Sequence, residues 1–499
     1  MVWPKEPPAP VAAADTSPHD TRWWRSDVVV LLILLIMATL LRAPGLAPPS
    51  LWLDDVWVAL VSKVDDPALV LRMGVTAPGF SSLQNLVFAV LGFSELSAQL
   101  LPFAAAVAAP PTVYVVMRRW GMSPYGSSLA GLVLVLAPIH VTFSTSAKQF
   151  SIDVLLGLVL LHLAWRASQQ PSSDRVAAAA GVAVTATVIS ASVAPIAATV
   201  LTISFALGLA PDRRRLLMWP IAAGVLLAGY TVLIANWTPQ VLGEFWSDEL
   251  STGVLDGPAA AWRVLEGFLG VRLLAVAAAA WIVAGLARSS LLLRMLLVGP
   301  VLVAIGVSYL GVPLGTGRTD QYLYGPLAIA IGLPLETVAR EIWMRASAIV
   351  LVGVVMAIPR PLPGYADPNS AMQQRDRQHI EEAAEALTED GQLVTVGTTF
   401  AVGLYGPWEV EIFDAPSSTT GWWPIVDDRR VVNVAGWPST PAALRSGFPD
   451  LSARRVEVVL THFGYDIIDE VKIIMHERGY RLRNETGRSG SWWGSFEIP

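Results

Sequence analysis

Two adjacent carboxylates, Asp54 and Asp55, follow the first apolar segment of the chain in the stretch SLWLDDVW (50–57). A carboxylate can act as a general base that takes the proton of an attacking hydroxyl group, which typically accelerates a reaction by about 10²–10⁴-fold. A neighbouring carboxylate raises the apparent pKa of the pair through like-charge repulsion, or helps it to bind a divalent cation. The alternative is structural, because Asp is favoured at the positively polarised N-terminus of a helix. Trp52 and Trp57 fit either a substrate pocket or an anchor at the membrane interface.

Two basic residues, Arg318 and Lys148, are candidates for binding an anionic group near these carboxylates. Guanidinium binds phosphate through paired hydrogen bonds, and Lys148 is the only lysine in the core of the apolar region. The structural alternatives are an arginine that snorkels at a helix end and a solvated loop lysine. Asp153 stands one turn into the next apolar segment and could pair with Lys148, since a carboxylate inside a membrane is costly unless it is paired.

Four further residues are candidates for lining a donor or acceptor pocket, namely Asp320, Tyr322, Tyr324 and Glu244. The first three follow Arg318 closely, whereas Glu244 lies in a long polar stretch. Tyrosine is common at membrane interfaces, and an ordinary solvated loop would account for Glu244 equally well. No compact cluster of metal ligands appears in the sequence, so the only cofactor that we consider is a divalent cation at Asp54 and Asp55.

The composition indicates that these residues belong to a membrane protein. Of the 499 residues, 54% are hydrophobic and 15% are charged, and the mean hydropathy is +0.53. Ordinary soluble domains carry about 25% charged residues, so much of this chain is expected to lie in lipid. The absence of cysteine excludes disulfides, thiolate metal sites and a cysteine nucleophile. The formal net charge of −6 gives no reason to expect nucleic acid as a partner.

A transmembrane helix needs about 20 apolar residues, and the sequence predicts about eleven such spans. These are 27–45, 96–117, 126–144, 151–166, 176–194, 196–210, 216–235, 270–287, 291–310, 324–339 and 346–358. Residues 1–26 are expected to form a disordered cytoplasmic tail before a first span that is retained as a signal-anchor, because no cleavage site follows it.

The basic residues set the expected orientation, because they collect in cytoplasmic loops. With the N-terminus inside, every inner connection carries arginine, namely Arg118, Arg119, Arg166, Arg175, Arg213, Arg214, Arg215, Arg288, Arg294, Arg340 and Arg345. This alternation requires residues 78–93 to lie in the interface rather than to cross the membrane. Loops 46–95, 236–269 and 311–323 are then outside, and the candidate site lies on the outer face.

The composition changes after the expected transmembrane domain of residues 27–360. Residues 375–387 and 466–479 have helical periodicity, while 392–398, 408–413, 430–435 and 454–463 are strand-like. The fold class that we expect is therefore a polytopic α-helical membrane protein with a C-terminal extracytoplasmic α/β domain over residues 361–499.

Four patches of the sequence together resemble the GT-C superfamily of polytopic membrane glycosyltransferases. They are LWLDDVW (51–57), TAPGF (76–80), AKQFSID (147–153) and GRTDQYLY (317–324), all expected on the outer side. The resemblance in layout covers about residues 27–345. The chain departs from the usual pattern at Asp55, where many relatives have Glu, and at Ala77-Pro78, where they have two prolines.

The resemblance implies an inverting glycosyltransferase in a bacterial cell (inner) membrane. The donor would be a polyprenyl-phosphate sugar, whose tail lies in the lipid bilayer, and the acceptor a cell-wall or envelope glycan or lipid. Asp54 would be the base, Asp55 its neighbour, and Arg318 and Lys148 the phosphate-binding cations. Trp52, Trp57, Asp153, Asp320, Tyr322, Tyr324 and Glu244 would line the pocket.

Three other functions remain open from the sequence. A transporter of lipid-linked saccharide usually carries charged residues at mid-membrane and repeated halves, and this sequence shows few such charges. A ligase that transfers a whole glycan from a pyrophosphate lipid would also use outer cations. An inactive scaffold with a glycan-binding outer domain is the third.

Overall fold

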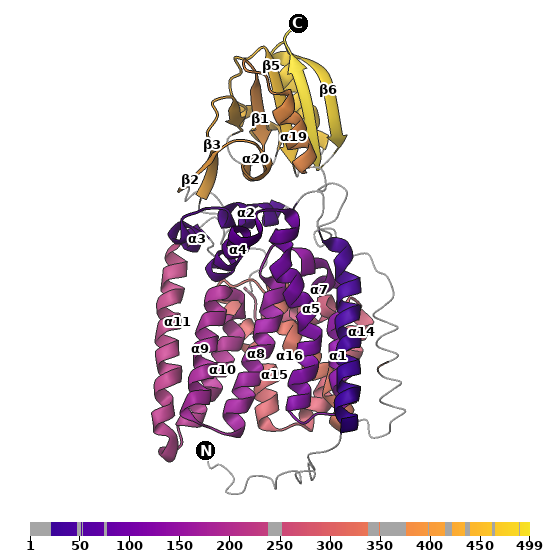
Figure 1. Cartoon of the computed structure of the whole chain (residues 1–499), viewed down its shortest axis with the longest axis vertical. Coiled ribbons are helices and arrows are strands. Elements are labelled where there is room, and N and C mark those ends of the chain that lie inside the picture. Colours follow the sequence, from indigo (N-terminus) through magenta and orange to yellow (C-terminus); the bar gives the residue numbers. More distant parts are fainter. Residues whose placement is uncertain are drawn as a thin grey trace.

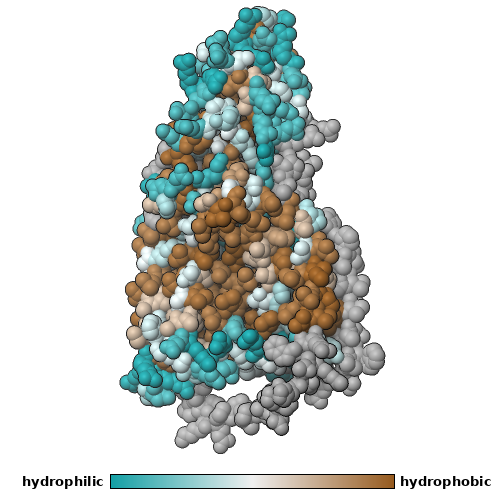
Figure 2. Space-filling model, in the orientation of Figure 1, coloured by the Kyte–Doolittle hydropathy of each residue, from teal (hydrophilic) through white to brown (hydrophobic). Residues whose placement is uncertain are grey.

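The computed structural model describes residues 21–46, 51, 53–73, 77–237, 252–337, 349, 376–397, 399–414, 422–434, 440–461, 465–488 and 490–499. A helical bundle carries a strand-containing domain on one of its ends (Figure 1). The flank of the bundle is mainly hydrophobic, while its far end and most of the small domain are hydrophilic (Figure 2). This distribution is that of a multi-pass membrane protein with a polar domain outside the lipid.

The bundle consists of thirteen described helices between residues 21 and 337, many of them long and apolar. They are α1 (Thr21–Arg42), α5 (Glu95–Arg119), α6 (Pro124–Leu136), α7 (Pro138–Thr142), α8 (Phe150–Gln169), α9 (Ser173–Ile189), α10 (Ala194–Gly208), α11 (Met218–Trp237), α13 (Asp256–Leu269), α14 (Arg272–Ala287), α15 (Leu291–Ser308), α16 (Tyr324–Gly332) and α17 (Pro334–Thr337).

Among the described residues, six helices are long and apolar enough to cross a membrane, or up to eight if two bent pairs each count as one span. The eleventh expected span, 346–358, lies outside the described residues apart from residue 349. The count of eleven and the orientation therefore stay predictions. Helix α1 begins at Thr21, so residues 21–26, expected in the tail, are helical; residues 1–20 lie outside the described part.

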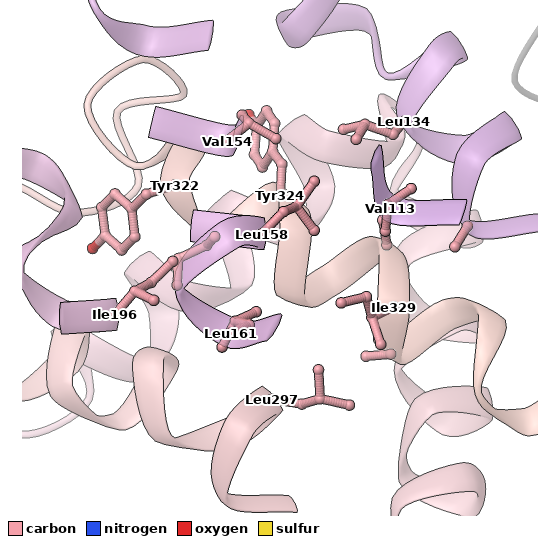
Figure 3. Close-up of a cluster of buried hydrophobic side chains, with 14 of the residues drawn as sticks. Val113, Leu134, Val154, Leu158, Leu161, Ile196, Leu297, Tyr322, Tyr324 and Ile329 are labelled. Atoms are coloured by element: carbon pink, nitrogen blue, oxygen red, sulfur yellow. The ribbon is translucent and has the colours of Figure 1, made fainter. Parts of the chain in front are cut away.

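The bundle core is formed by aliphatic and aromatic side chains from helices that are distant in the sequence. Leu158 and Leu161 of α8 lie among Val113 of α5, Ile196 of α10 and Ile329 of α16 (Figure 3). Tyr322 and Tyr324 also belong to this core.

A break between α6 and α7 precedes the turn that carries Lys148. The expected single span 126–144 is instead bent by 57° at this point. Pro138 has no amide hydrogen to donate, so the carbonyl of Leu134 loses its helical partner. Arg42, at the end of α1 and only 1% exposed, donates from Nη2 to Leu134 O (3.2 Å) and from Nη1 to Val135 O (3.2 Å). The arginine thus satisfies the carbonyls that the break exposes.

The stretch expected as outer loop 46–95 contains three helices at the end of the bundle nearest the small domain (Figure 1). They are α2 (Leu53–Ser62), α3 (Pro67–Met73) and α4 (Pro78–Leu91). With 14 residues α4 is too short to span a bilayer. Leu86, Val90 and Leu91 of α4 are at least 60% exposed. The position of this helix in the membrane interface stays a prediction.

The stretch expected as outer loop 236–269 also contains a helix, α13, which meets α14 at 110°. Its buried side chains, among them Val264, Leu265 and Phe268, pack into the bundle core. The sequence did not predict this helix, because it is short and lies in a polar stretch that was expected to be a loop.

The C-terminal domain is an α/β sandwich around a five-stranded sheet. The strand order is β4 (Val431–Asn433), β1 (Gln392–Val396), β5 (Arg455–Thr461), β7 (Ser491–Glu497) and β6 (Arg481–Arg488). The pairs β4–β1 and β1–β5 are parallel, whereas β5–β7 and β7–β6 are antiparallel. A separate hairpin is formed by β2 (Val410–Asp414) and β3 (Trp422–Val426).

The helices of this domain cover the two faces of the sheet. Leu393 and Val459 face α19 (Asp376–Ala386), whereas Val394 and Val458 face α22 (Tyr465–Glu477). The remaining helices are α20 (Thr399–Tyr405) and α21 (Pro441–Gly447). The expected domain boundary at 360/361 falls outside the described residues.

The domain and the bundle share one hydrophobic cluster of buried side chains. It joins side chains of α2, α4 and α5 to side chains of α19, α20 and β3, including Leu60, Phe88, Ala98, Ile380, Phe400, Leu404 and Val426. Figure 1 shows α20 directly beside α2. The small domain therefore packs on the segment that carries Asp54 and Asp55.

Candidate active site beneath the C-terminal domain

The site is built around Asp54, where three segments distant in the sequence meet. Asp54 lies in the first turn of α2, Lys148 in the turn before α8, and Arg318 in the loop before the short helix η6 (Gln321–Leu323). Arg318 Nη1 lies 2.9 Å and Lys148 Nζ 3.2 Å from the same carboxylate oxygen, Asp54 Oδ2. The structure thus brings together the expected base and both expected phosphate-binding cations.

These three side chains are partly shielded from solvent. The exposed fraction is 31% for the Asp54 side chain, 17% for Arg318 and 11% for Lys148. In such surroundings charges interact more strongly than in bulk water. Because two cations lie close to one carboxylate oxygen, the binding of a second anion between them, such as a phosphate group, is also favourable.

Asp55 points in another direction and is buried, with 3% exposed. Ser146 Oγ donates a hydrogen bond of 2.7 Å to Asp55 Oδ1. Burial raises the pKa of Asp55 to about 6, although the bonds from Ser146 and the Ala147 backbone and the charge of Lys148 oppose this shift. The pair therefore consists of one accessible, ion-paired carboxylate and one buried carboxyl group.

Aromatic rings fix the position of Lys148. Its Nζ lies 4.9 Å from the ring centroid of Trp57 and 5.9 Å from that of Phe150. A cation over an aromatic face gains about 0.5–2 kcal/mol, depending on its solvation. Trp57 thus contacts Lys148, and its expected place in a substrate pocket stays a prediction.

The loop that carries Arg318 is held by a second buried carboxyl, Asp320. Gly315 N and Gly317 N donate to Asp320 Oδ2 at 2.8 and 3.4 Å. Both glycines have positive φ, 83° and 78°, which glycine adopts without strain. Burial raises the pKa of Asp320 to about 6 against these two hydrogen bonds. Asp320 therefore holds the backbone of the loop in place through these two hydrogen bonds.

The other expected pocket residues lie deeper or outside the described part. Asp153 is fully buried beside Ser190, and Lys148 pairs with Asp54 instead of Asp153. Tyr322 and Tyr324 are 4% and 0% exposed, so both pack in the core below the site. Trp52 and Glu244 lie outside the described residues.

Two nearby residues were not singled out from the sequence. Ser146 binds Asp55, and its place two residues before Lys148 was the available signal. Arg263 of α13 lies close to Gly315 and acts electrostatically on Asp320. It lies in the expected outer loop 236–269, where we considered only Glu244 as a candidate.

The described residues contain no group of three or more His, Asp or Glu side chains that could hold a metal ion. A cation at Asp54 and Asp55 stays an expectation from the sequence.

No protein-family model and no curated protein matches this sequence. Solved structures do match. The crystal structure of ArnT from Cupriavidus metallidurans in the apo state has a TM-score of 0.56 and 13% identity, covering 95% of this chain and 98% of that chain. The structure of the same protein bound to undecaprenyl phosphate has a TM-score of 0.54 and 13% identity, covering 96% and 98%.

These matches show that the chain has the fold of ArnT. ArnT is a GT-C family polyprenyl-phosphate-dependent glycosyltransferase. The resemblance to GT-C proteins that the four sequence patches indicated is thereby confirmed at the level of the fold.

Proposed function

We propose that this chain is an inverting glycosyltransferase of a bacterial cell membrane. It would move a sugar from a polyprenyl-phosphate donor to a cell-envelope glycan or lipid on the outer face. The observation that carries this proposal is the convergence of Arg318 and Lys148 on Asp54. The ArnT-like fold, and the undecaprenyl phosphate named for one ArnT structure, support a lipid phosphate as the anion.

In this arrangement, binding of the donor would increase the basicity of Asp54. A carboxylate with two close cations is a weak base, because the cations stabilise its charged form. A donor phosphate placed between Arg318 and Lys148 would take over both cations. Asp54 would then become more basic when the substrate is present.

The transfer follows from these positions. Asp54 takes the proton of the acceptor hydroxyl while the hydroxyl oxygen bonds to the anomeric carbon of the sugar. The bond between that carbon and the phosphate oxygen breaks, and the polyprenyl phosphate leaves with the electron pair. Arg318 and Lys148 stabilise the negative charge that develops on the leaving phosphate. Attack opposite the leaving group inverts the anomeric centre.

The test is sugar transfer by the purified full-length protein, with a panel of undecaprenyl-phosphate sugars and an envelope glycan extract. Asp54→Asn is expected to lower the rate by about 10²-fold or more, because the general base is lost. Arg318→Ala should lower it by a similar factor, because the leaving phosphate loses a paired donor.

The matched control is Arg288→Ala. Arg288 lies in the connection between α14 and α15, at the opposite end of these helices from the Arg318 loop. This variant should keep wild-type activity. Full activity of Asp54→Asn would exclude Asp54 as the base, and vectorial movement of a lipid-linked sugar without transfer would contradict the proposed class.

A further inference from the structure

A hydrogen bond ties the start of the segment that carries the site carboxylates to the C-terminal domain. The backbone N–H of Leu51, three residues before Asp54, donates to Tyr405 Oη at 2.7 Å. Leu51 is 1% exposed, and Tyr405 is the last residue of α20. A buried N–H needs a partner, and the partner here comes from the other domain.

Tyr405 is itself held by a chain of contacts that ends on the bundle. The guanidinium of Arg377 lies 5.9 Å from the Tyr405 ring centroid. Arg377 Nη1 also lies 2.7 Å from Glu95 Oε1, and its Nε donates to Glu381 at 2.8 Å. Glu95 is the first residue of α5, and its side chain is 10% exposed. The Tyr405 ring therefore lies beside an ion pair, Arg377–Glu95, that joins the two domains.

The apolar packing around this hydrogen bond leaves little room for the segment to move. Leu51, Val56 and Leu60 belong to the same buried cluster as Val402 and Leu404 of α20. Directly after the C-terminal end of α2, Lys63 Nζ donates to Leu404 O at 3.4 Å. Both ends of α2 thus contact α20.

We propose that Tyr405 is a positioning residue for Asp54, through which the C-terminal domain holds the start of α2 in its reactive place. The proposal rests on the function proposed above and adds a role for the C-terminal domain. Asp54 must keep a hydrogen-bonding distance to the acceptor hydroxyl while the donor phosphate occupies the two cations. A shift of about 1 Å in such a group can lower a rate by about 10²-fold.

The variant that isolates this bond is Tyr405→Phe, which keeps the ring and removes the hydroxyl. Its matched control is Tyr480→Phe in the same domain. Tyr480 Oη donates to the backbone carbonyl of Ala453 at 2.6 Å in the core on the far side of the sheet. Both variants remove one hydroxyl bound to one backbone group, but only Tyr405 contacts the segment before Asp54.

The first readout is amide hydrogen exchange of the full-length protein in detergent, which does not depend on activity. Residues 51–62 are expected to exchange at least about tenfold faster in Tyr405→Phe than in the wild type, and at the wild-type rate in Tyr480→Phe. Unchanged exchange in Tyr405→Phe, or the same acceleration in both variants, would overturn the proposal.

The second readout is sugar transfer with the panel of undecaprenyl-phosphate sugars. Tyr405→Phe should lower kcat by about tenfold or more, with KM for the lipid donor within about twofold of the wild type, because the cations remain. Tyr480→Phe should change neither. An effect on KM alone would contradict a positioning role. If the wild type transferred no sugar, the proposed function would fail while hydrogen exchange would still decide the role of Tyr405.

Discussion

Asp54 and Asp55 are neighbours in the chain with opposite environments. Asp54 is accessible and faces two cations, whereas Asp55 is buried and bound by Ser146. Successive side chains of a helix point in directions about 100° apart, which is why adjacent acids can differ so much. The structural alternative considered for the pair, a helix start, is also correct, because both lie in the first turn of α2. One motif therefore serves the fold and the proposed chemistry.

The pH dependence of transfer should report on Asp55. Its pKa is raised by burial to about 6, so its carboxyl becomes protonated as the pH falls through about 6. Ionised Asp55 raises the basicity of adjacent Asp54 by like-charge repulsion, and protonation removes that help. We expect kcat/KM of the wild type to decline below about pH 6 and Asp55→Asn to lack this step. The measurement is transfer from pH 5 to 8.

Stability provides the control for that variant. The folded-state pKa of Asp55 lies above the unfolded value of about 3.9. Its contribution to stability is therefore present below about pH 4 and is lost as the pH rises through about 6. Asn mimics the protonated form, so Asp55→Asn should melt no lower than the wild type at pH 7. An identical acid step in both proteins would show that another group causes it.

The loop from Val312 to Asp320 is the element on which the position of Arg318 depends. Gly315 has φ of 83°, and a Cβ there would lie 2.9 Å from the carbonyl oxygen of Ala260. Gly311 has φ of 93°, but a Cβ there would meet nothing within 4 Å. An alanine at either position would strain the backbone, but only at Gly315 would it also overlap with other atoms. The two substitutions therefore distinguish the effect of backbone strain from that of steric overlap.

Gly315→Ala should therefore lower transfer by about tenfold or more, because the overlap moves the loop that holds Arg318. Gly311→Ala should cost only the backbone strain of about 1 kcal/mol and leave transfer within about twofold. The check is transfer by both variants together with their melting temperatures. Equal losses in the two variants would contradict the importance of the loop position.

The sequence predicted individual elements better than their connections in space. Strand-like alternation and flanking turns gave β1 and β5 nearly to the residue, and helical periodicity gave α19. The break at Pro138 was missed because hydropathy continues through it. The turn at 110° between α13 and α14 was missed for the opposite reason, because polar residues precede it.

The contact between Asp54 and Arg318, which are 264 residues apart in the chain, could not be predicted from the sequence. Each residue could be placed on the same side of the membrane, but not within hydrogen-bonding distance. The sequence also suggested the wrong partner for Lys148. Asp153 is its neighbour in the chain, whereas the structure pairs Lys148 with the distant Asp54. The contact of Tyr405 with Leu51 had no local signal at all.

At the scale of the whole molecule, the proposed orientation places the C-terminal domain outside the cell. The chain contains no cysteine, so single-cysteine variants can report each side. Ser446 is exposed in the C-terminal domain, and the Asp212 side chain is 74% exposed in an expected inner connection.

Ser446→Cys should react with a membrane-impermeant maleimide in intact spheroplasts. Asp212→Cys should react only after the membrane has been permeabilised. The reverse pattern would invert the topology and move the site to the cytoplasmic face. Labelling of both variants in intact spheroplasts would contradict the odd number of spans expected between the two positions.

The central claim is that the cations facing Asp54 receive a lipid phosphate, and binding tests it without knowledge of the sugar. The measurement is the Kd of the purified protein for undecaprenyl phosphate in detergent, for the wild type, Arg318→Ala, Lys148→Ala and Arg288→Ala. Loss of a charge-assisted contact costs about 1.5–3 kcal/mol, so Kd should rise about tenfold or more in the first two variants and stay unchanged in Arg288→Ala. Equal affinity in all four proteins would show that these cations do not hold the phosphate, and the account of the site would be wrong.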